Sequence, residues 1–154
     1  FVGGCTLDAA ERVMGDGSWG IRDADEGAQI PSPDILEGLY ALVAHNLLRQ
    51  EEQADGEPRL TMLELIHDFA REQLVASGEL DAVADAHAAF YLALAARAVA
   101  DGAAIEPAVW QVHLDPERGN LRAALARRRE RGAAIGMTDD EFVRLRAVLD
   151  PFLR

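Results

Sequence analysis

The chain contains no lysine: all 15 of its basic residues are arginine, against 27 acidic residues, which gives a net charge of −12. A phosphate-binding loop of an ATPase needs both a lysine and a characteristic glycine spacing, and this sequence has neither. The pair Gly3-Gly4 is better explained as a turn before a helix. We therefore expect that this chain is not itself an enzyme.

Cysteine, aromatic residues and long apolar runs are also scarce. A single cysteine, Cys5, cannot form an internal disulfide, which fits a reducing, cytoplasmic compartment, and we expect it to be a small buried apolar residue. Few aromatics and many alanines favour closely packed helices. The longest apolar run, 86–96, is too short to span a bilayer. The start, Phe-Val-Gly-Gly-Cys, suggests an excised piece and not a secreted precursor.

The negative charge is concentrated in the first part of the chain. Residues 1–89 hold 18 acidic residues against 5 arginines, a net of −13, whereas residues 90–154 hold 9 against 10, a net of +1. Nucleic-acid binding needs a basic surface for phosphate contacts. We therefore expect the first part to dock on a basic protein surface.

Residues 47–78 predict a β-hairpin followed by a helix. Asp55-Gly56 lies between two short apolar runs and is a dipeptide favoured at the tip of a hairpin. The spacing of Thr61 and Glu64 predicts a capping box at the start of a helix, and Gly78 is expected to end that helix. One apolar face is predicted for this helix: Met62, Leu63, Leu65, Ile66, Phe69, Ala70 and Leu74. A hairpin flanked by helices is the outline of a winged helix, which we predict for residues 1–78.

Two further helices are predicted before the hairpin. Thr6 is a predicted N-cap for a helix over 7–14, and Ser32-Pro33 is a start signal for a helix that ends near Asn46. Residues 15–31, rich in Gly and Asp, are predicted to be mostly loop, held to the core by Trp19 and Ile21.

Beyond Gly78 the pattern is helical throughout. Four helices are predicted there. The first runs from Leu80 to Gly102, the second begins at Pro107, and the third begins at Pro116 and ends at Gly132. The fourth begins at Thr138 and Glu141 and has Pro151 near its end. Thr138 and Glu141 form a second predicted capping box, and Pro151 is expected to interrupt the last helix. Successive helices with short loops predict antiparallel helical hairpins of TPR-like type over 79–154, in a mainly α protein.

Five segments together resemble one family. They are residues 1–10, 39–49, 59–70, 87–95 and 120–125. They are similar, in this order, to the region that follows the nucleotide-binding domain in STAND-class NB-ARC ATPases, above all bacterial transcriptional regulators of the AfsR and large LuxR-like type. The resemblance implies a winged helix packed on an ATPase core and the start of a TPR-like sensor region. It also implies ATP or ADP with Mg²⁺ in the parent protein.

The family's winged helix carries, in related eukaryotic proteins, a Met-His-Asp motif whose His approaches bound ADP. The corresponding position here reads Met62-Leu63-Glu64. Leu63 cannot hydrogen-bond a phosphate, and Glu64 is assigned first to the capping box. We therefore expect no appreciable binding of ATP or ADP by this chain alone.

Other residues offer alternative sites. The pair His67-Asp68 would suit a metal-dependent phosphohydrolase, which needs further ligands nearby. The other histidines lie on different predicted helices, so His67 is expected to be a side chain at the rim of an apolar face and not a metal ligand. His87 is expected to be a hydrogen-bonded packing residue. Four arginines could contact nucleic acid, but they also suit a solvated or partner-facing helix end: Arg127, Arg128, Arg129 and Arg131.

The sequence thus favours a non-catalytic regulatory module that relays nucleotide state between an ATPase core and a helical sensor region. Its expected partners are the preceding nucleotide-binding domain and proteins that contact the helical region, with no membrane and no direct nucleic acid. The alternatives are a DNA-binding winged helix and, less favoured, a metal-dependent phosphohydrolase. Against DNA binding, the predicted recognition helix 33–46 carries Asp34 and Glu37 and no basic residue.

Overall fold

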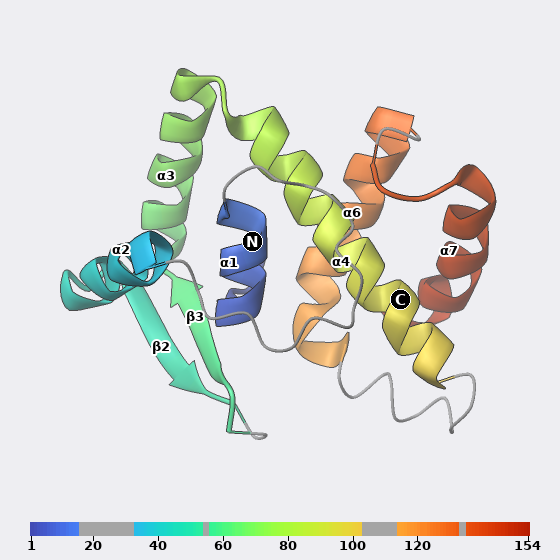
Figure 1. Ribbon diagram of the computed structural model, residues 1–154, viewed down its shortest axis with the longest axis horizontal. Helices are drawn as coiled ribbons and strands as arrows, with labels where there is room; N and C mark the ends of the chain where they lie inside the picture. The colour runs from blue at the N-terminus through green and yellow to red at the C-terminus, as the bar shows by residue number, and fades with distance from the viewer. Residues whose placement is uncertain (16–32, 54–55, 103–113, 133–134) are drawn as a thin grey trace. The chain divides into compact units, whose positions relative to one another are not determined.

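The computed structural model describes residues 1–15, 33–53, 56–102, 114–132 and 135–154. These residues form six α-helices and one small antiparallel sheet, so the predicted mainly α class is confirmed (Figure 1). They divide into two compact units. Gly4–Leu80 is called the sheet unit below. Asp81–Arg154 together with Phe1–Gly3 is called the helical unit.

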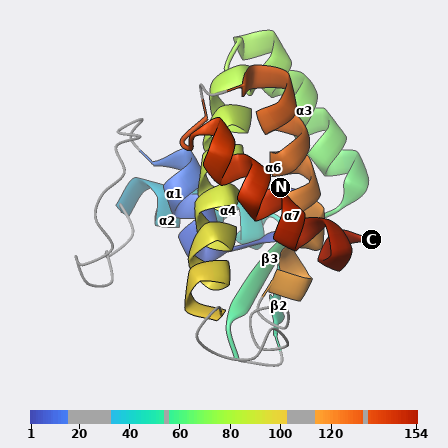
Figure 2. The same cartoon turned by 90° about the vertical axis from the view of Figure 1, so that its right-hand side faces the viewer.

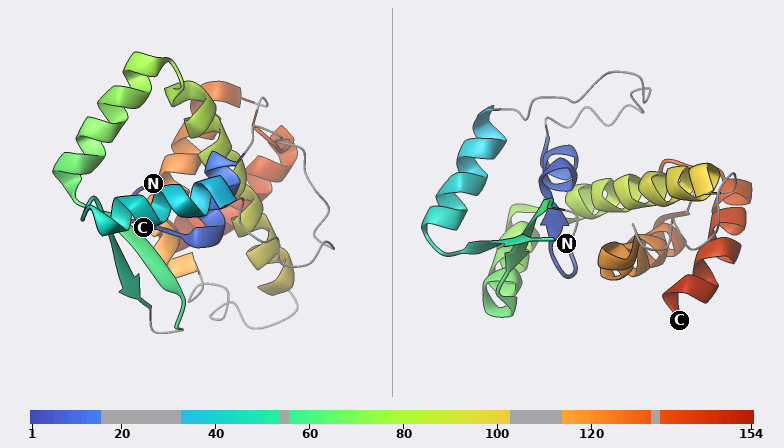
Figure 3. Two further views of the ribbon diagram at one scale, coloured as in Figure 1. Left: turned by 60° about the vertical axis from the view of Figure 1, so that its left-hand side comes forward. Right: turned by 90° about the horizontal axis from the view of Figure 1, so that it is seen from below.

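The sheet has three antiparallel strands in the order β1-β3-β2. These are β1 (Cys5–Thr6), β2 (Leu48–Glu52) and β3 (Pro58–Met62). The predicted hairpin is confirmed: β2 pairs with β3, with Gln50 opposite Leu60, and Gly56 takes the positive φ of 84° that its turn requires (Figure 3). Cys5 lies opposite Leu60 and is buried, as expected.

Three helices complete the sheet unit: α1 (Leu7–Met14), α2 (Pro33–Ala44) and α3 (Glu64–Ser77). The predicted caps of α1 are confirmed, because the Thr6 hydroxyl accepts a hydrogen bond from the Ala9 amide at 3.2 Å and Gly15 ends the helix. Proline begins α2 as predicted. Gly78 ends α3 in the left-handed conformation.

The predicted capping box of Thr61 and Glu64 is wrong. Thr61 belongs to β3 and lies opposite Arg49, and its hydroxyl donates to Glu51 Oε1 across the hairpin at 3.3 Å. Leu63 is the N-cap of α3, with no side-chain cap hydrogen bond. The strand pairing extends two residues further than the capping rule allows, and it draws the Thr61 side chain toward β2.

The helical unit contains α4 (Leu80–Gly102), the 3-10 turn η1 (Asp115–Glu117), α6 (Arg118–Arg131) and α7 (Asp139–Leu153) (Figures 1 and 2). Its largest fully buried side chains include Tyr91 and Leu92 of α4, Leu121 of α6 and Leu149 of α7. The predicted helix at Pro107, with Trp110, lies outside the described residues, and so does the predicted loop with Trp19 and Ile21.

The last helix confirms one sequence prediction and corrects another. The capping box is present: the Thr138 amide donates to Glu141 Oε2 at 2.8 Å, and the Glu141 amide donates to Thr138 Oγ1 at 3.3 Å. These hydrogen bonds lower the pKa of the Glu141 carboxyl. Pro151 does not interrupt α7, which continues to Leu153. The buried side chains of Phe152 and Leu153 hold the last turn in place despite the missing proline N–H.

Helix α4 is long for a small unit. By length and composition alone, its stretch Leu80–Ala100 is long and apolar enough to cross a membrane. This stretch is longer than the apolar run 86–96, which by itself is too short to span a bilayer. Ala88, Tyr91 and Ala95 of this stretch are completely buried within the protein. Those apolar residues therefore form part of the core of the helical unit.

We predict that Thr138→Ala lowers the free energy of unfolding of the helical unit by about 1 kcal/mol, because it removes the N-cap acceptor of α7. Thr138→Ser retains the hydroxyl and should keep most of the stability. Urea denaturation of the two variants checks this, and equal midpoints would contradict the role of the hydroxyl.

Thr61→Ala, at an exposed pair in the hairpin, should change the free energy of unfolding by no more than about 0.5 kcal/mol.

Candidate functional site

The position of the family's sensor motif lies at the junction of β3 and α3. Met62 is the last residue of β3, Leu63 is the N-cap of α3, and Glu64 is its first helical residue. The side chain of Leu63 is 47% exposed and offers neither a donor nor an acceptor. The Leu63 side chain therefore cannot form a polar contact with a nucleotide.

The apolar residues of α3 lie on one half of the helix circumference, as predicted, but they differ in exposure. Ile66, Ala70 and Leu74 are half-buried. Leu65 and Phe69, one turn apart at one edge of this face, are 83% and 60% exposed. No residue of α3 is buried. We call Leu65 and Phe69 the α3 patch.

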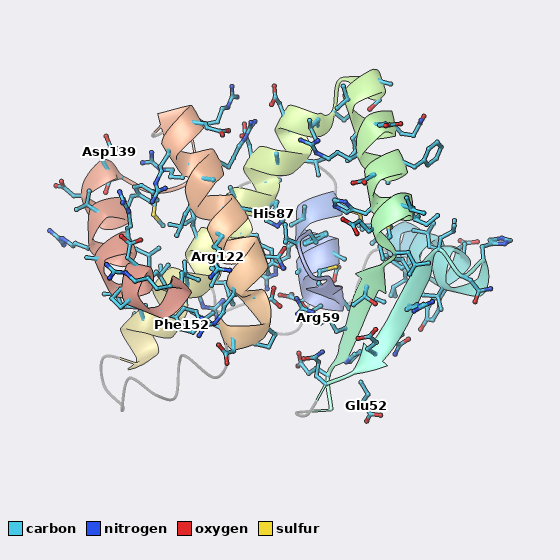
Figure 4. All side chains as sticks on the ribbon, turned by 180° about the vertical axis from the view of Figure 1, so that it is seen from behind. Glu52, Arg59, His87, Arg122, Asp139 and Phe152 are labelled. Atoms are coloured by element: carbon cyan, nitrogen blue, oxygen red, sulfur yellow. The ribbon has the colours of Figure 1, made fainter. Side chains whose placement is uncertain are left out.

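The hairpin beside α3 is more acidic at its surface than the sequence suggests. Arg59 is 5% exposed, and its Nη2 donates to the carbonyl oxygen of Gly4 at 3.1 Å (Figure 4). Glu51, Glu52 and Glu57 are exposed. Among the described residues of the hairpin, Arg49 is therefore the one basic side chain at the surface.

Gly4, whose carbonyl oxygen accepts this hydrogen bond, lies close against β3. Its φ is +89°, and a Cβ there would lie 2.5 Å from the carbonyl oxygen of Leu60. Only glycine lets β1 approach β3 this closely. The sequence reading of Gly3-Gly4 as a turn missed this close approach, because nothing local indicates that a strand will pack against it.

The helical unit encloses a buried polar cluster around Asn120 of α6. Asn120 Oδ1 accepts a hydrogen bond from the Val2 amide at 2.6 Å and lies 3.2 Å from Nε2 of His87. Its Nδ2 donates to Glu117 Oε2 at 2.6 Å. Because Oδ1 can only accept, Nε2 of His87 must carry the proton. The cluster thus joins α4, α6, η1 and the first residues of the chain.

The same cluster holds residues 1–3 against the helices. The Phe1 ring makes edge contacts with the rings of His87 and Tyr91, at centroid distances of 5.3 and 6.2 Å. A Cβ on Gly119 would lie 2.8 Å from the carbonyl oxygen of Val2, so only glycine fits there. The first three residues are therefore fixed by both packing and hydrogen bonding.

His87 is a hydrogen-bonded packing residue, as predicted. Burial lowers its pKa from 6.5 to about 4, against the opposing effects of the Asn120 hydrogen bond and the Glu117 charge. The imidazole is consequently neutral at neutral pH. Sequence reasoning did not find Asn120 as its partner, which lies 33 positions away.

The other histidine weighed as a site lies at the surface. His67 Nδ1 is 3.7 Å from Asp68 Oδ1, and the side chains are 43% and 66% exposed. Within the part of the chain that the structure describes, no three His, Cys, Asp or Glu residues are grouped so that they could hold a metal ion. The described residues thus give no geometric support to a metal-dependent phosphohydrolase.

Most of the arginine cluster at the end of α6 is paired with acidic residues. Arg127 contacts Asp81 and Asp85 at 2.8 and 2.6 Å, and Arg131 contacts Asp85 at 3.1 Å. Arg128 is 2% exposed and contacts Asp139 at 2.8 Å. The prediction of a solvated or partner-facing helix end is therefore wrong for Arg128. These pairings tie α6 to α4 and α7.

Comparison with known proteins gives no match: no protein-family model, no curated protein and no solved structure matches this chain.

We predict that the helical unit loses stability as the pH falls from about 6.5 toward 4. The unfolded state binds a proton at His87 with a pKa near 6.5, whereas the folded state does so only near 4, so the full contribution is present above pH 6.5. The expected loss between pH 7 and pH 5 is on the order of 1 to 2 kcal/mol. Urea denaturation at several pH values measures it.

His87→Gln is the matched control for this pH dependence. Glutamine keeps a neutral donor for Asn120 but does not titrate, so its unfolding free energy should fall less over the same pH range. An identical pH profile in the two proteins would show that His87 is not the group responsible.

Proposed function

We propose that the chain is a non-catalytic regulatory module of a STAND-type signalling ATPase, in a bacterial transcriptional regulator. In this proposal the sheet unit is a winged helix that docks on the preceding nucleotide-binding domain. The helical unit is the start of a TPR-like sensor region. The module relays nucleotide state between the two through interdomain packing.

The order of elements supports a winged helix in the sheet unit. A strand, two helices and a hairpin follow one another as β1, α1, α2, β2 and β3, and β1 pairs with β3 to give the order β1-β3-β2. Helix α2 would be the recognition helix of a DNA-binding member. Over Pro33–Ala44 it carries no basic residue, which favours a protein partner over DNA.

The α3 patch is the single observation that carries the docking proposal. Leu65 and Phe69 are large apolar side chains that lie mostly exposed on a helix with no buried residue. Exposed apolar residues that lie together mark contact surfaces, and these two directly follow the position of the family's sensor motif. The partner proposed for the α3 patch is therefore the nucleotide-binding domain that the family places upstream.

The acidic hairpin supports the same partner through charge. With Arg59 buried, the hairpin surface presents Glu51, Glu52 and Glu57 against Arg49. A basic face on the nucleotide-binding domain would complement it, and such a rim contact weakens as salt rises because charges are screened over about 10 Å at 0.1 M ionic strength. Duplex DNA would be repelled instead.

We predict that the double substitution Leu65→Asp with Phe69→Asp weakens binding to the separately expressed upstream domain, loaded with ADP, by at least about tenfold. Central apolar contacts of an interface typically contribute that much. Both side chains are exposed, so the fold should be retained, which circular dichroism can verify. Isothermal titration at two salt concentrations measures the affinity.

Val143→Asp provides the matched control, because Val143 is 65% exposed on α7 in the helical unit. It is combined with Val148→Asp, 40% exposed on the same helix, so that the control introduces the same two negative charges at exposed sites outside the sheet unit. Equal effects of the two variants would refute docking through the α3 patch. Submicromolar binding of random duplex DNA mapped to residues 33–62 would favour the DNA-binding alternative.

A further inference from the structure

A second feature of the helical unit is a surface hollow of about 330 Å³ between α6 and α7. It is lined by Arg122, Leu125, Arg129, Asp150, Leu153 and Arg154. Of these, Leu125 and Leu153 are buried apolar residues. Three guanidinium groups and one carboxylate make up the rest of the lining. The lining thus combines apolar residues with an excess of positive charge.

The arginines of this hollow differ from the others on α6 in their partners. Arg118, Arg127, Arg128 and Arg131 each form an ion pair with an aspartate. In the part of the chain that the structure describes, the side chains of Arg129 and Arg154 form neither a hydrogen bond nor an ion pair. Arg129 and Arg154 therefore bring to one site two positive charges that no ion pair offsets.

Arg122 is positioned by the protein itself. Its Nε and Nη2 both donate to the carbonyl oxygen of Leu153, the former at 3.2 Å (Figure 4). A guanidinium group has five N–H donors, so this contact leaves three of them for another acceptor. The group is therefore held in place and still able to bind an oxyanion, without losing much side-chain entropy on binding.

The carboxylate of Asp150 is partly engaged elsewhere. Its Oδ2 lies 3.3 Å from Nε of Arg146, one turn earlier on α7. The side chains that line the hollow carry three positive charges against one negative charge. A phosphate ester carries between −1.5 and −2 charges at neutral pH, and arginine binds phosphate oxygens through pairs of parallel N–H groups.

We propose that this hollow binds the phosphate group of a small molecule, with Arg122, Arg129 and Arg154 as its ligands. The volume is at the lower end of that of small-ligand pockets, which suits a phosphate with a few attached atoms. The site lies within the helical unit and does not depend on the partner proposed for the α3 patch.

The test uses inorganic phosphate as the probe and the chain of residues 1–154. Backbone amide NMR shifts are followed during titration at pH 7, with ionic strength held constant by sodium chloride. Saturable shifts centred on residues 122–129 and 149–154 are expected. Arg129→Gln should weaken binding about tenfold by removing a charge-assisted contact, whereas Asp150→Asn should strengthen it by removing the opposing charge.

Arg97→Gln is the matched control. Arg97 is exposed on α4 and does not line the hollow, so the same loss of charge there should leave the phosphate affinity unchanged. Binding should also weaken as the pH is lowered through neutrality, because inorganic phosphate loses its second negative charge there. Shifts that do not saturate, or equal weakening by Arg97→Gln and Arg129→Gln, would overturn the site.

Discussion

The helical unit depends on one buried amide, that of Asn120. Its side chain is completely buried, and its two polar atoms are hydrogen-bonded to Val2 and Glu117, with His87 at the same oxygen. Leaving a buried donor or acceptor without its partner costs more than a hydrogen bond contributes on average. The amide therefore favours one arrangement of α4, α6, η1 and residues 1–3 over other packings of the same apolar side chains.

The chain passes between the two compact units twice. Phe1–Gly3 belong to the helical unit, whereas the next residues, from Gly4 through β1, belong to the sheet unit. The polypeptide thus passes from one unit to the other at Gly3-Gly4, where both glycines have positive φ, and again after Leu80.

Local rules predicted the elements whose signals do not compete. Thr6, Gly78 and the pair Thr138 and Glu141 end or cap helices as predicted because each is set by its immediate neighbours. The rules failed where two of them applied at once. Thr61 satisfies both a capping box and a strand position, and strand pairing decides the outcome. Pro151 should break a helix, but the packing of Phe152 and Leu153 outweighs one missing hydrogen bond.

The candidate sites were predictable only in part. The sequence predicted the acidic character of the sheet unit, but which apolar residues of the α3 face are half-buried and which are exposed depends on tertiary contacts. Charge pairing is equally a property of the fold. Arg127, Arg128 and Arg131 meet aspartates of α4 and α7, while Arg129, in the same run, meets none among the described residues. No periodicity in the sequence distinguishes Arg129 from its neighbours.

Hydrogen exchange of the Val2 amide tests most directly whether Asn120 fixes the first residues of the chain. In the native protein this amide should exchange at least about tenfold more slowly than in an unstructured peptide, and Asn120→Ala should restore the peptide rate while the amides of α7 stay protected. Glu117→Gln, which leaves Oδ1 of Asn120 in place, should keep the protection. Exchange of the native Val2 amide at the peptide rate would contradict the arrangement.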